Sequence, residues 1–523
     1  MTWFKLLFLL AVPAFAQRVA EPGIPVTDPL VIAKCGACHH QDDKGNLTRI
    51  SWERTTPEGW EEVIKRMVRL NGLALKPEEA RAIVKSLSTT HGLAPEEAKP
   101  VMYIPERRSV DESLPSEAVR QACASCHPIG RARSWHRSKE EWDLLVLMHR
   151  GYFTVAEQSF RGNGGREGRQ VEGAKPAVDQ AIEYLSKDFP LTTPDWSAWR
   201  ARMRAPKLSG HWLVEGYEAG RGKIVGEMQI EPGASEDEFT GSVKLTYLKD
   251  GSTVTKSSKS VVYTGYSWRG KTSDWREVMW VAPDQSSMQG RWFWGAYDEF
   301  GIDVKLRRAG DGIAVTGVDR TMLQTGSTGQ RVRIFGANFS KLTVTDIDFG
   351  SGVAVKRIVD QSAQQATVEV DVDAKAISGK RDVAVRRAVA PKAIVVYHQI
   401  DHIKVSPETA LARLGGVDYP KGFQQFEAIA YDHDVELGAV DAEWSVEEFY
   451  AVYGDDDSDF VGKLNAKGLF TPNVEGPNPK RRFSRNNYGD VWVVAKYNGL
   501  TAKSYLVVAV PLYVRWDQPE VAR

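Results

Sequence analysis

Four cysteines in a chain of 523 residues all fall within two Cys-x-x-Cys-His motifs. The motif residues are Cys35, Cys38 and His39 in the first, and Cys123, Cys126 and His127 in the second. This spacing is the attachment signature of c-type haem, because two thioether bonds anchor the porphyrin and place the adjacent histidine on the iron. Two disulfides are the alternative for four cysteines in an exported protein, but they leave both histidines without a role. The sequence therefore predicts two covalently bound haem c groups.

The N-terminus has the pattern of a secretory signal peptide. One early charge, Lys5, precedes the apolar run 6–12, and a small-x-small pattern ends at Ala16. The apolar run is too short to span a bilayer. We therefore expect residues 1–16 to be removed and an exported mature chain to begin at Gln17.

The two haem motifs belong to an internal duplication. Each motif is followed by an amphipathic helix headed by tryptophan, and a second helix closes each half, at 77–88 and at 176–186. The apolar positions of the two first helices share the spacing i, i+3, i+4, i+7; they are Trp60, Val63, Ile64 and Met67 in one, and Trp142, Leu145, Val146 and His149 in the other. Aligning the tryptophans places Met67 and His149 at equivalent positions.

Equivalent positions in two haem-binding repeats make Met67 and His149 candidate sixth ligands. Each has a structural alternative, since methionine and histidine on an apolar helix face usually pack in a core. We predict His39 and Met67 as ligands of the first iron, and His127 and His149 as ligands of the second. The competing candidates are Met102 and His91 for the first iron, and Met148 and His136 for the second.

Unequal ligation implies a direction of electron flow. A thioether raises the reduction potential of haem iron relative to a second imidazole. We therefore hypothesise that electrons enter at the second haem and leave from the first. Arg131 and Arg133, close to the second motif, are either partners of haem propionates or surface charges.

After about residue 205 the helical periodicity ends and short alternating runs begin. Asp250-Gly251 and Asn498-Gly499 predict β-hairpin turns. The predicted fold is multidomain, an α-helical dihaem cytochrome c domain followed by three all-β domains. Their expected bounds are 17–195 for the haem domain, 196–320 for a lipocalin-like β-barrel, 321–398 for an immunoglobulin-like (IPT/TIG-like) domain and 399–523 for a C-terminal β-sandwich.

The β segments contain no recognisable catalytic motif. The acidic run 454–459 lacks the ligand spacing of a calcium loop, so a solvated turn is the favoured interpretation, and Asp432-His433-Asp434 is read as a polar loop. A filled barrel interior is favoured over a ligand pocket. Lys+Arg 68 balances Asp+Glu 68, so no overall charge favours nucleic acid or an anionic membrane.

Together, the signal peptide, the duplicated haem motifs with unequal Met67 and His149, and three β domains resemble the α subunit of quinohemoprotein amine dehydrogenase. The resemblance covers essentially the whole mature chain. It implies a periplasmic heterotrimer in which this subunit transfers electrons and a small companion subunit carries a cysteine tryptophylquinone. A propeller-type subunit completes the complex.

In that family the quinone oxidises primary amines to aldehydes and ammonia, and the two haems pass the electrons to a soluble cytochrome c or a blue copper protein. No membrane insertion and no nucleic-acid partner is expected. All four cysteines are used by the haem motifs, so none remains here for a tryptophylquinone crosslink.

Two other functional classes remain open from the sequence. A dihaem cytochrome c peroxidase would need an open iron site and acid–base residues, for which His136, Glu140 and Glu141 are available. A haem-based gas sensor would bind carbon monoxide without loss of an axial ligand. We rank both below the electron-transfer subunit.

Overall fold

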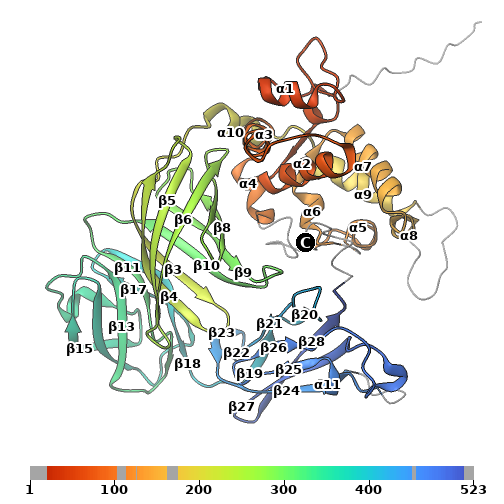
Figure 1. Ribbon diagram of the computed structural model, residues 1–523. Coiled ribbons are helices and arrows are strands. Elements are labelled where there is room, and N and C mark those ends of the chain that lie inside the picture. Colours follow the sequence, from red (N-terminus) through yellow and green to blue (C-terminus); the bar gives the residue numbers. More distant parts are fainter. Residues whose placement is uncertain (1–20, 103–112, 125–126, 162–174, 450–454, 512–523) are drawn as a thin grey trace, which may run out of the picture.

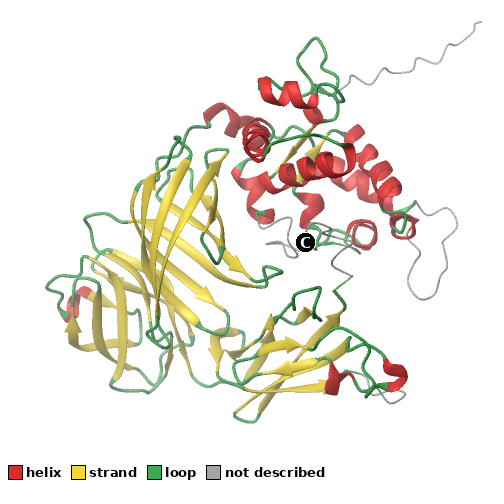
Figure 2. Cartoon of the chain, viewed as in Figure 1, coloured by secondary structure: helices red, strands yellow, loops and turns green. Residues whose placement is uncertain are grey.

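The computed structural model describes residues 21–102, 113–124, 127–161, 175–449 and 455–511 (Figure 1). A helical domain is followed by a closed β-barrel and two β-sandwich domains (Figure 2). The predicted fold class, a helical haem domain followed by three all-β domains, is confirmed. The predicted signal peptide 1–16 and Cys126 lie outside the described residues. Within those residues, no helix combines the length and apolar character needed to cross a bilayer.

The helical domain contains two halves of similar order. Its helices are α1 (Pro29–Cys35), α2 (Pro57–Asn71), α3 (Pro77–Thr90) and α4 (Pro95–Ala98), then α5 (Glu117–Cys123), α6 (Gly130–Arg133), α7 (Lys139–Tyr152), α8 (Ala156–Arg161), α9 (Ala177–Asp188) and α10 (Pro194–Arg202). Helices α1, α2 and α3 of the first half correspond in order to α5, α7 and α9 of the second half. Helix α10 begins at the expected boundary near residue 195 and packs against α4, and its Trp196 and Trp199 share a buried core with the barrel.

Side-chain caps fix the start of α2 and of α7. The Thr56 hydroxyl accepts the Gly59 N–H at 3.2 Å, and the Ser138 hydroxyl accepts the Glu141 N–H at 3.2 Å. Helix α2 ends at Gly72, which has a φ of 70° and supplies the left-handed residue such an end favours. The predicted helix after each haem motif is therefore confirmed.

A two-stranded sheet joins the two halves and was not predicted. Strands β1 (Glu53–Thr55) and β2 (Trp135–Arg137) pair antiparallel, with Arg54 opposite His136 at the centre. Arg54 precedes its helix tryptophan by six residues, and so does His136. Equivalent positions thus pair with each other, which relates the halves by a local two-fold axis at this sheet.

The two helix tryptophans show the same duplication in their hydrogen bonds. Trp60 and Trp142 are fully buried. The Trp60 indole N–H donates to the carbonyl of His91 at 3.0 Å, and that of Trp142 donates to the carbonyl of Phe189 at 3.2 Å. His91 and Phe189 are the residues that end α3 and α9. Each tryptophan therefore fixes its helix to the end of the closing helix in the same half.

The barrel has eight antiparallel strands in the closed order β10-β3-β4-β5-β6-β7-β8-β9. They are β3 (Gly210–Glu218), β4 (Gly222–Pro232), β5 (Glu238–Tyr247), β6 (Thr253–Tyr263), β7 (Ser267–Lys271), β8 (Arg276–Val281), β9 (Ser287–Trp294) and β10 (Phe300–Arg308). The Asp250-Gly251 hairpin is confirmed between β5 and β6. Buried indoles of Trp212, Trp268 and Trp292 belong to the core of this domain, which agrees with a filled interior.

The next domain packs two four-stranded sheets, ordered β11-β13-β16-β15 and β12-β18-β17-β14. They contain β11 (Ala314–Val318), β12 (Met322–Gln324), β13 (Gln330–Ala337), β14 (Ile347–Asp348), β15 (Val353–Gln361), β16 (Gln365–Val372), β17 (Gly379–Val385) and β18 (Ala388–Tyr397). The expected boundary at residue 320 needs a correction. Strand β11 pairs with β13, so the sandwich begins before residue 314.

The C-terminal domain has three sheets, ordered β19-β22-β23, β20-β28-β27-β24 and β21-β26-β25. Its elements are β19 (His402–Ser406), β20 (Thr409–Arg413), β21 (Gln424–Gln425), β22 (Glu427–Asp432), β23 (Val435–Val440), β24 (Glu443–Glu448), α11 (Asp457–Phe460), β25 (Gly462–Leu464), β26 (Leu469–Pro472), β27 (Gly489–Tyr497) and β28 (Leu500–Ala509). The predicted hairpin at Asn498-Gly499 is confirmed, since it joins β27 to β28.

Candidate haem sites

The first motif lies at the end of α1. The Asp28 carboxylate caps the start of this helix, and Cys35 is its last residue. Cys35 is buried, whereas Cys38 on the following turn is exposed. The Nδ1–H of His39 donates to the Thr48 carbonyl at 2.8 Å. This bond fixes the tautomer and leaves Nε2 available to an iron, as in most metal-ligating histidines.

The second motif repeats this arrangement on α5. Ser116 caps the helix and Cys123 is its last residue. The Nδ1–H of His127 donates to the Pro128 carbonyl at 3.0 Å, so its Nε2 is likewise available. Burial lowers the pKa of His127 to about 4, which keeps the ring in the neutral form that binds a metal. Cys126, the remaining member of the motif, lies outside the described residues.

The cysteines do not have the character of a redox dithiol. Burial raises the pKa of Cys35, and it raises that of Cys123 to about 12. Redox-active Cys-x-x-Cys pairs instead contain a thiol whose pKa is lowered. Cys35, Cys38 and Cys123 are all free of disulfides. Their surroundings suit thioether attachment better than thiol exchange.

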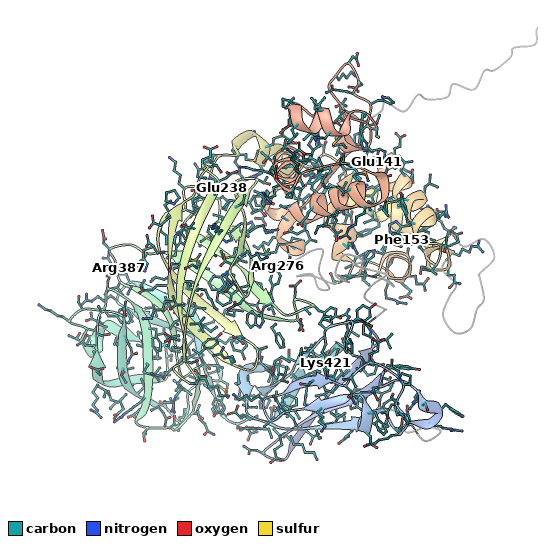
Figure 3. All side chains as sticks on the ribbon, viewed as in Figure 1. Glu141, Phe153, Glu238, Arg276, Arg387 and Lys421 are labelled. Carbon is teal, nitrogen blue, oxygen red and sulfur yellow. The ribbon has the colours of Figure 1, made fainter. Side chains whose placement is uncertain are left out.

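His149 lies on α7 near the second motif. Its Nδ1–H donates to the Leu145 carbonyl at 2.9 Å, which again leaves Nε2 without a role in the protein. The ring packs near Phe153 and Phe160, with centroids 5.9 Å and 6.0 Å away. Glu141 and Phe153 mark the two ends of α7 in Figure 3, and His149 belongs to the Phe153 end. A positive charge on His149 would also lower the pKa of His127, after the larger effects of burial and of Arg131.

Met67 lies on α2 and is partly exposed. Trp60 and Ile64, on the same face of α2, share a buried cluster with Cys35 of the first motif. Met67 follows Ile64 on that face but does not belong to the cluster. Helix α2 and the attachment helix α1 thus both pack against α3, with Met67 beyond the edge of the packed core.

The alternative ligands for the first iron have other partners. His91 is fully buried, with Nε2 donating to the Ile24 carbonyl at 3.0 Å and Nδ1 at 2.8 Å from the Thr90 hydroxyl. Both ring nitrogens are therefore used. Met102 is buried against the barrel, in a small cluster with Phe293. These contacts disfavour both residues as ligands.

The alternatives for the second iron also have structural partners. His136 is buried at the centre of the β1–β2 sheet, where its Nδ1–H donates to the Pro190 carbonyl at 3.0 Å and lies 3.6 Å from Glu97. The sulfur of Met148 accepts a contact from Arg66 at 3.4 Å. His136 therefore helps to join the two halves, and Met148 contacts the helix of the other half.

Two arginines near the second motif make contacts within the helical domain, one with the first half and one with the second. Arg131 binds both oxygens of Glu62 on α2, at 2.9 Å and 3.0 Å. Arg133 donates to the Tyr184 hydroxyl at 3.2 Å. The two arginines proposed as either propionate partners or surface charges thus make defined contacts within the protein. Arg66, which the sequence analysis did not single out, has no such carboxylate partner among the described residues.

The barrel holds the start of α2. Arg269 on β7 forms a two-point ion pair with Glu58 in the first turn of α2, through Nε and through Nη2, the latter at 3.1 Å. Only 14% and 12% of these side chains are exposed. A second pair across the same interface joins Lys85 to Asp237 at 2.8 Å and is more exposed. The helix that carries Met67 is therefore fixed partly by another domain.

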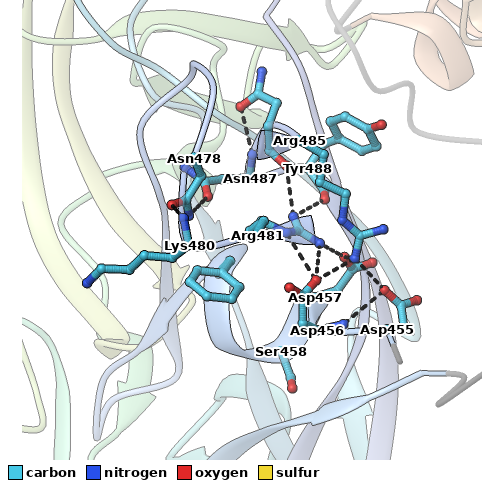
Figure 4. A network of polar contacts seen from close by, with 12 residues as sticks. Asp455, Asp456, Asp457, Ser458, Asn478, Lys480, Arg481, Arg485, Asn487 and Tyr488 are labelled. Carbon is cyan, nitrogen blue, oxygen red and sulfur yellow. Dashed lines mark hydrogen bonds and ion pairs between the residues drawn. The ribbon is translucent and has the colours of Figure 1, made fainter. Parts of the chain in front are cut away.

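The acidic run predicted as a solvated turn is part of an ion-pair network (Figure 4). Arg481 is fully buried and bonds to Asp456 at 2.8 Å and to Asp457. Arg485 bonds to Asp455 at 2.7 Å and also to Asp456. The interpretation as a solvated turn was therefore wrong for residues 455–457, because these arginines follow some 25 residues later in the chain. The carboxylates already have cationic partners.

The Asp432-His433 loop is also held by internal hydrogen bonds. The buried Asp432 carboxylate accepts bonds from the Ser378 hydroxyl at 2.6 Å and from the His398 N–H at 2.8 Å. His433 lies 2.9 Å from Asp432 and 3.3 Å from Asp401. These contacts fix the junction between the last two domains and agree with a polar loop.

The residues at both motifs fit a haem group. Each histidine has a fixed tautomer with a free Nε2, and Cys35 and Cys123 each end a capped helix beside it. Together with the fold, these sites define a class of protein, a haem-binding domain carried on three β domains.

Comparison with protein families identifies the particular member of this class. Models of the quinohemoprotein amine dehydrogenase alpha subunit match nearly the whole chain: the haem-binding part at residues 26–196, domain II at 205–309, domain III at 313–398 and domain IV at 403–521. The chain therefore belongs to the family of quinohemoprotein amine dehydrogenase alpha subunits, and it is a haem-binding subunit of an oxidoreductase complex.

Comparisons with individual proteins add little. No curated protein sequence matches the chain. Among solved structures, a de novo designed fluorescence-activating β-barrel matches at 18% identity over 19% of this chain and 93% of that chain, with a TM-score of 0.16. SGBP-B of the Bacteroides ovatus mixed-linkage glucan utilization locus matches at 10% identity over 57% of this chain and 60% of that chain, with a TM-score of 0.19.

Proposed function

We propose that this chain is the electron-transfer subunit of the amine dehydrogenase complex and carries two covalently attached haem c groups. Thioether attachment is assigned to Cys35, Cys38, Cys123 and Cys126. The axial ligands are His39 and Met67 for the first iron, and His127 and His149 for the second. Bound haem would supply reversible one-electron oxidation and reduction at its iron.

The observation that carries this proposal is the histidine pair at the second site. His127 lies in the loop after α5 and His149 lies on α7, and each donates Nδ1–H to a backbone carbonyl, at 3.0 Å and 2.9 Å. Their free Nε2 atoms could therefore fill the two axial positions of the second haem iron. An iron closed on both sides has no position for a substrate, so it serves in electron transfer.

The overall reaction fits two one-electron carriers. Conversion of a primary amine and water to an aldehyde and ammonia releases two electrons and two protons, one electron for each haem. The oxidant of the amine is proposed to be a cysteine tryptophylquinone on a small partner subunit, with a propeller-type subunit completing a heterotrimer. This assignment is supported by the cysteine count, because the haem motifs use all four cysteines of this chain.

The proposed place of action is the periplasm. Support comes from the N-terminal pattern, a single early lysine, an apolar run and Ala14-Phe15-Ala16. A soluble cytochrome c or a blue copper protein is the proposed electron acceptor.

Purification of the native complex from periplasm tests the proposal. We expect two haems per chain by the pyridine haemochrome assay and a tightly bound small subunit that stains for a quinone. One haem per chain would contradict the dihaem assignment. Two haems without any quinone-bearing partner would contradict the amine dehydrogenase role.

The peroxidase alternative loses support from the residues it needs. His136 donates to the Pro190 carbonyl, and the Glu141 carboxylate binds Arg49 at 2.6 Å. The Glu141 contact joins the two halves, and His136 also pairs with Arg54 across the β1–β2 sheet, so both residues have structural roles. Rapid haem oxidation with turnover after peroxide is added to the reduced protein would favour the peroxidase.

A further inference from the structure

Arg66 lies between the two helices that carry the predicted sixth ligands. It precedes Met67 on α2, and its Nη1 is 3.4 Å from the sulfur of Met148, which precedes His149 on α7. Figure 1 shows α2 and α7 in the middle of the helical domain, below α1 and above α5, and this contact joins them. The guanidinium is therefore placed at the junction of the two haem sites.

This guanidinium has no anionic partner in the described part of the chain. No carboxylate oxygen of those residues lies within 4 Å of it. The two acids whose charges act on Arg66 are paired with other arginines, Glu53 with Arg137 and Glu62 with Arg131 at 2.9 Å. Arg66 is only partly exposed, and its one polar contact is a thioether, which is a weak acceptor.

A partly buried cation without an anion is costly, because lost hydration is not replaced by a charged partner. A haem group brings two propionate carboxylates. Guanidinium and carboxylate are matched in geometry, since two parallel N–H groups can bind both oxygens.

We propose that Arg66 binds a haem propionate at the junction of the two haem sites and thereby raises the reduction potential of that haem. This inference rests on the proposed attachment of haem at both motifs. A propionate charge near the iron favours the ferric state, which carries one more positive charge than the ferrous state. Pairing with Arg66 neutralises that propionate charge, so reduction to the ferrous state becomes easier. Arg66 acts on the haem through its propionate and is not itself an iron ligand.

The test uses the complete haem-loaded protein with the substitutions Arg66→Gln and Arg66→Lys. Spectroelectrochemical titration measures the midpoint potential of each haem, and resonance Raman spectroscopy measures the propionate bending bands. The matched control is Lys65→Gln, which removes the same charge from the neighbouring position of α2. Lys65 is exposed and pairs with exposed Glu61, so neither measurement should change.

Arg66→Gln is expected to lower the equilibrium constant for reduction of one haem about tenfold. Coulomb's law gives this size for a unit charge roughly 10 Å from the iron in a medium of effective dielectric constant near 20. For a one-electron couple, tenfold is 59 mV. Arg66→Lys should restore most of the potential but leave the propionate bands shifted, because lysine lacks the two-point geometry.

Unchanged potentials and unchanged propionate bands in Arg66→Gln would overturn the proposal. A lower potential with unchanged propionate bands would also overturn it, because the charge would then act through space without contact. If Arg66→Gln fails to fold, the Raman bands of Arg66→Lys decide. Failure of the proposed function is recognised separately, since the unsubstituted protein would then contain fewer than two haems.

Discussion

Replacing Arg269 with methionine tests how the barrel holds the helix that carries Met67. Arg269 is 14% exposed and pairs at two points with Glu58, which is 12% exposed. Its remaining N–H groups donate to the Ser267 hydroxyl at 2.9 Å and to the Trp268 carbonyl at 3.1 Å. Methionine keeps much of the side-chain volume but leaves the Glu58 carboxylate without a partner at the domain interface.

The size of the effect follows from burial. Removing one member of a buried ion pair costs about 3–5 kcal/mol, because the other charge stays desolvated. The Lys85–Asp237 pair crosses the same interface with side chains 39% and 20% exposed, and such pairs contribute about 0–1 kcal/mol. With a urea dependence of about 2 kcal/mol per molar, Arg269→Met should lower the unfolding midpoint of the haem domain by about 2 M.

Urea unfolding of the haem-loaded chain, followed by Soret absorption, measures this difference. Lys85→Ala is the matched control and should move the midpoint by less than a quarter as much. The double substitution Glu58→Gln with Arg269→Met removes both charges and should recover much of the lost stability. The reasoning is refuted if Arg269→Met destabilises no more than Lys85→Ala does.

Three further predictions concern other parts of the chain. His149→Met should raise the midpoint potential of the second haem by at least the 59 mV of a tenfold change, since a thioether favours ferrous iron; an unchanged potential would contradict the ligand assignment. Burial lowers the pKa of His91 from 6.5 to about 4, so the unfolded chain takes up this proton first as pH falls. Stability should therefore decline by about 3 kcal/mol between pH 6.5 and 4, and urea unfolding of His91→Gln across that range should lack this component. Arg481→Met should destabilise the C-terminal domain by about 3–5 kcal/mol, because the buried Asp457 loses its buried cation and keeps only the more exposed Arg485; calorimetry that shows a loss below about 1 kcal/mol would contradict this.

Local features of this fold could be predicted from the sequence because their determinants lie close together in the chain. Thr56 and Ser138 stand where a cap is needed, and each is followed by an apolar spacing of 3.6 residues. Asn498 and Gly499 both adopt the positive φ values, 47° and 82°, that a tight hairpin turn requires. Each of these signals is complete within a short local stretch of the chain.

Other features depend on residues that are far apart in the sequence. The pairing of Arg54 with His136 uses strands of three residues each, too short to give a periodic signal. Arg269 and Glu58 are separated by 211 residues, and nothing at either position indicates the other. Arg66 lacks a carboxylate partner in the described part of the chain because Glu62 and Glu53 pair with arginines 69 and 84 residues away, and the sequence near Arg66 gives no sign of those pairs.

Low-temperature electron paramagnetic resonance of the oxidised, haem-loaded protein tests the central claim most directly. With two irons per chain, one held by His39 and Met67 and the other by His127 and His149, we predict two distinct low-spin ferric signals. Met67→Ala should replace one of them with a high-spin signal, and His149→Ala should replace the other. Spectra of both variants that match the spectrum of the unsubstituted protein would contradict the account.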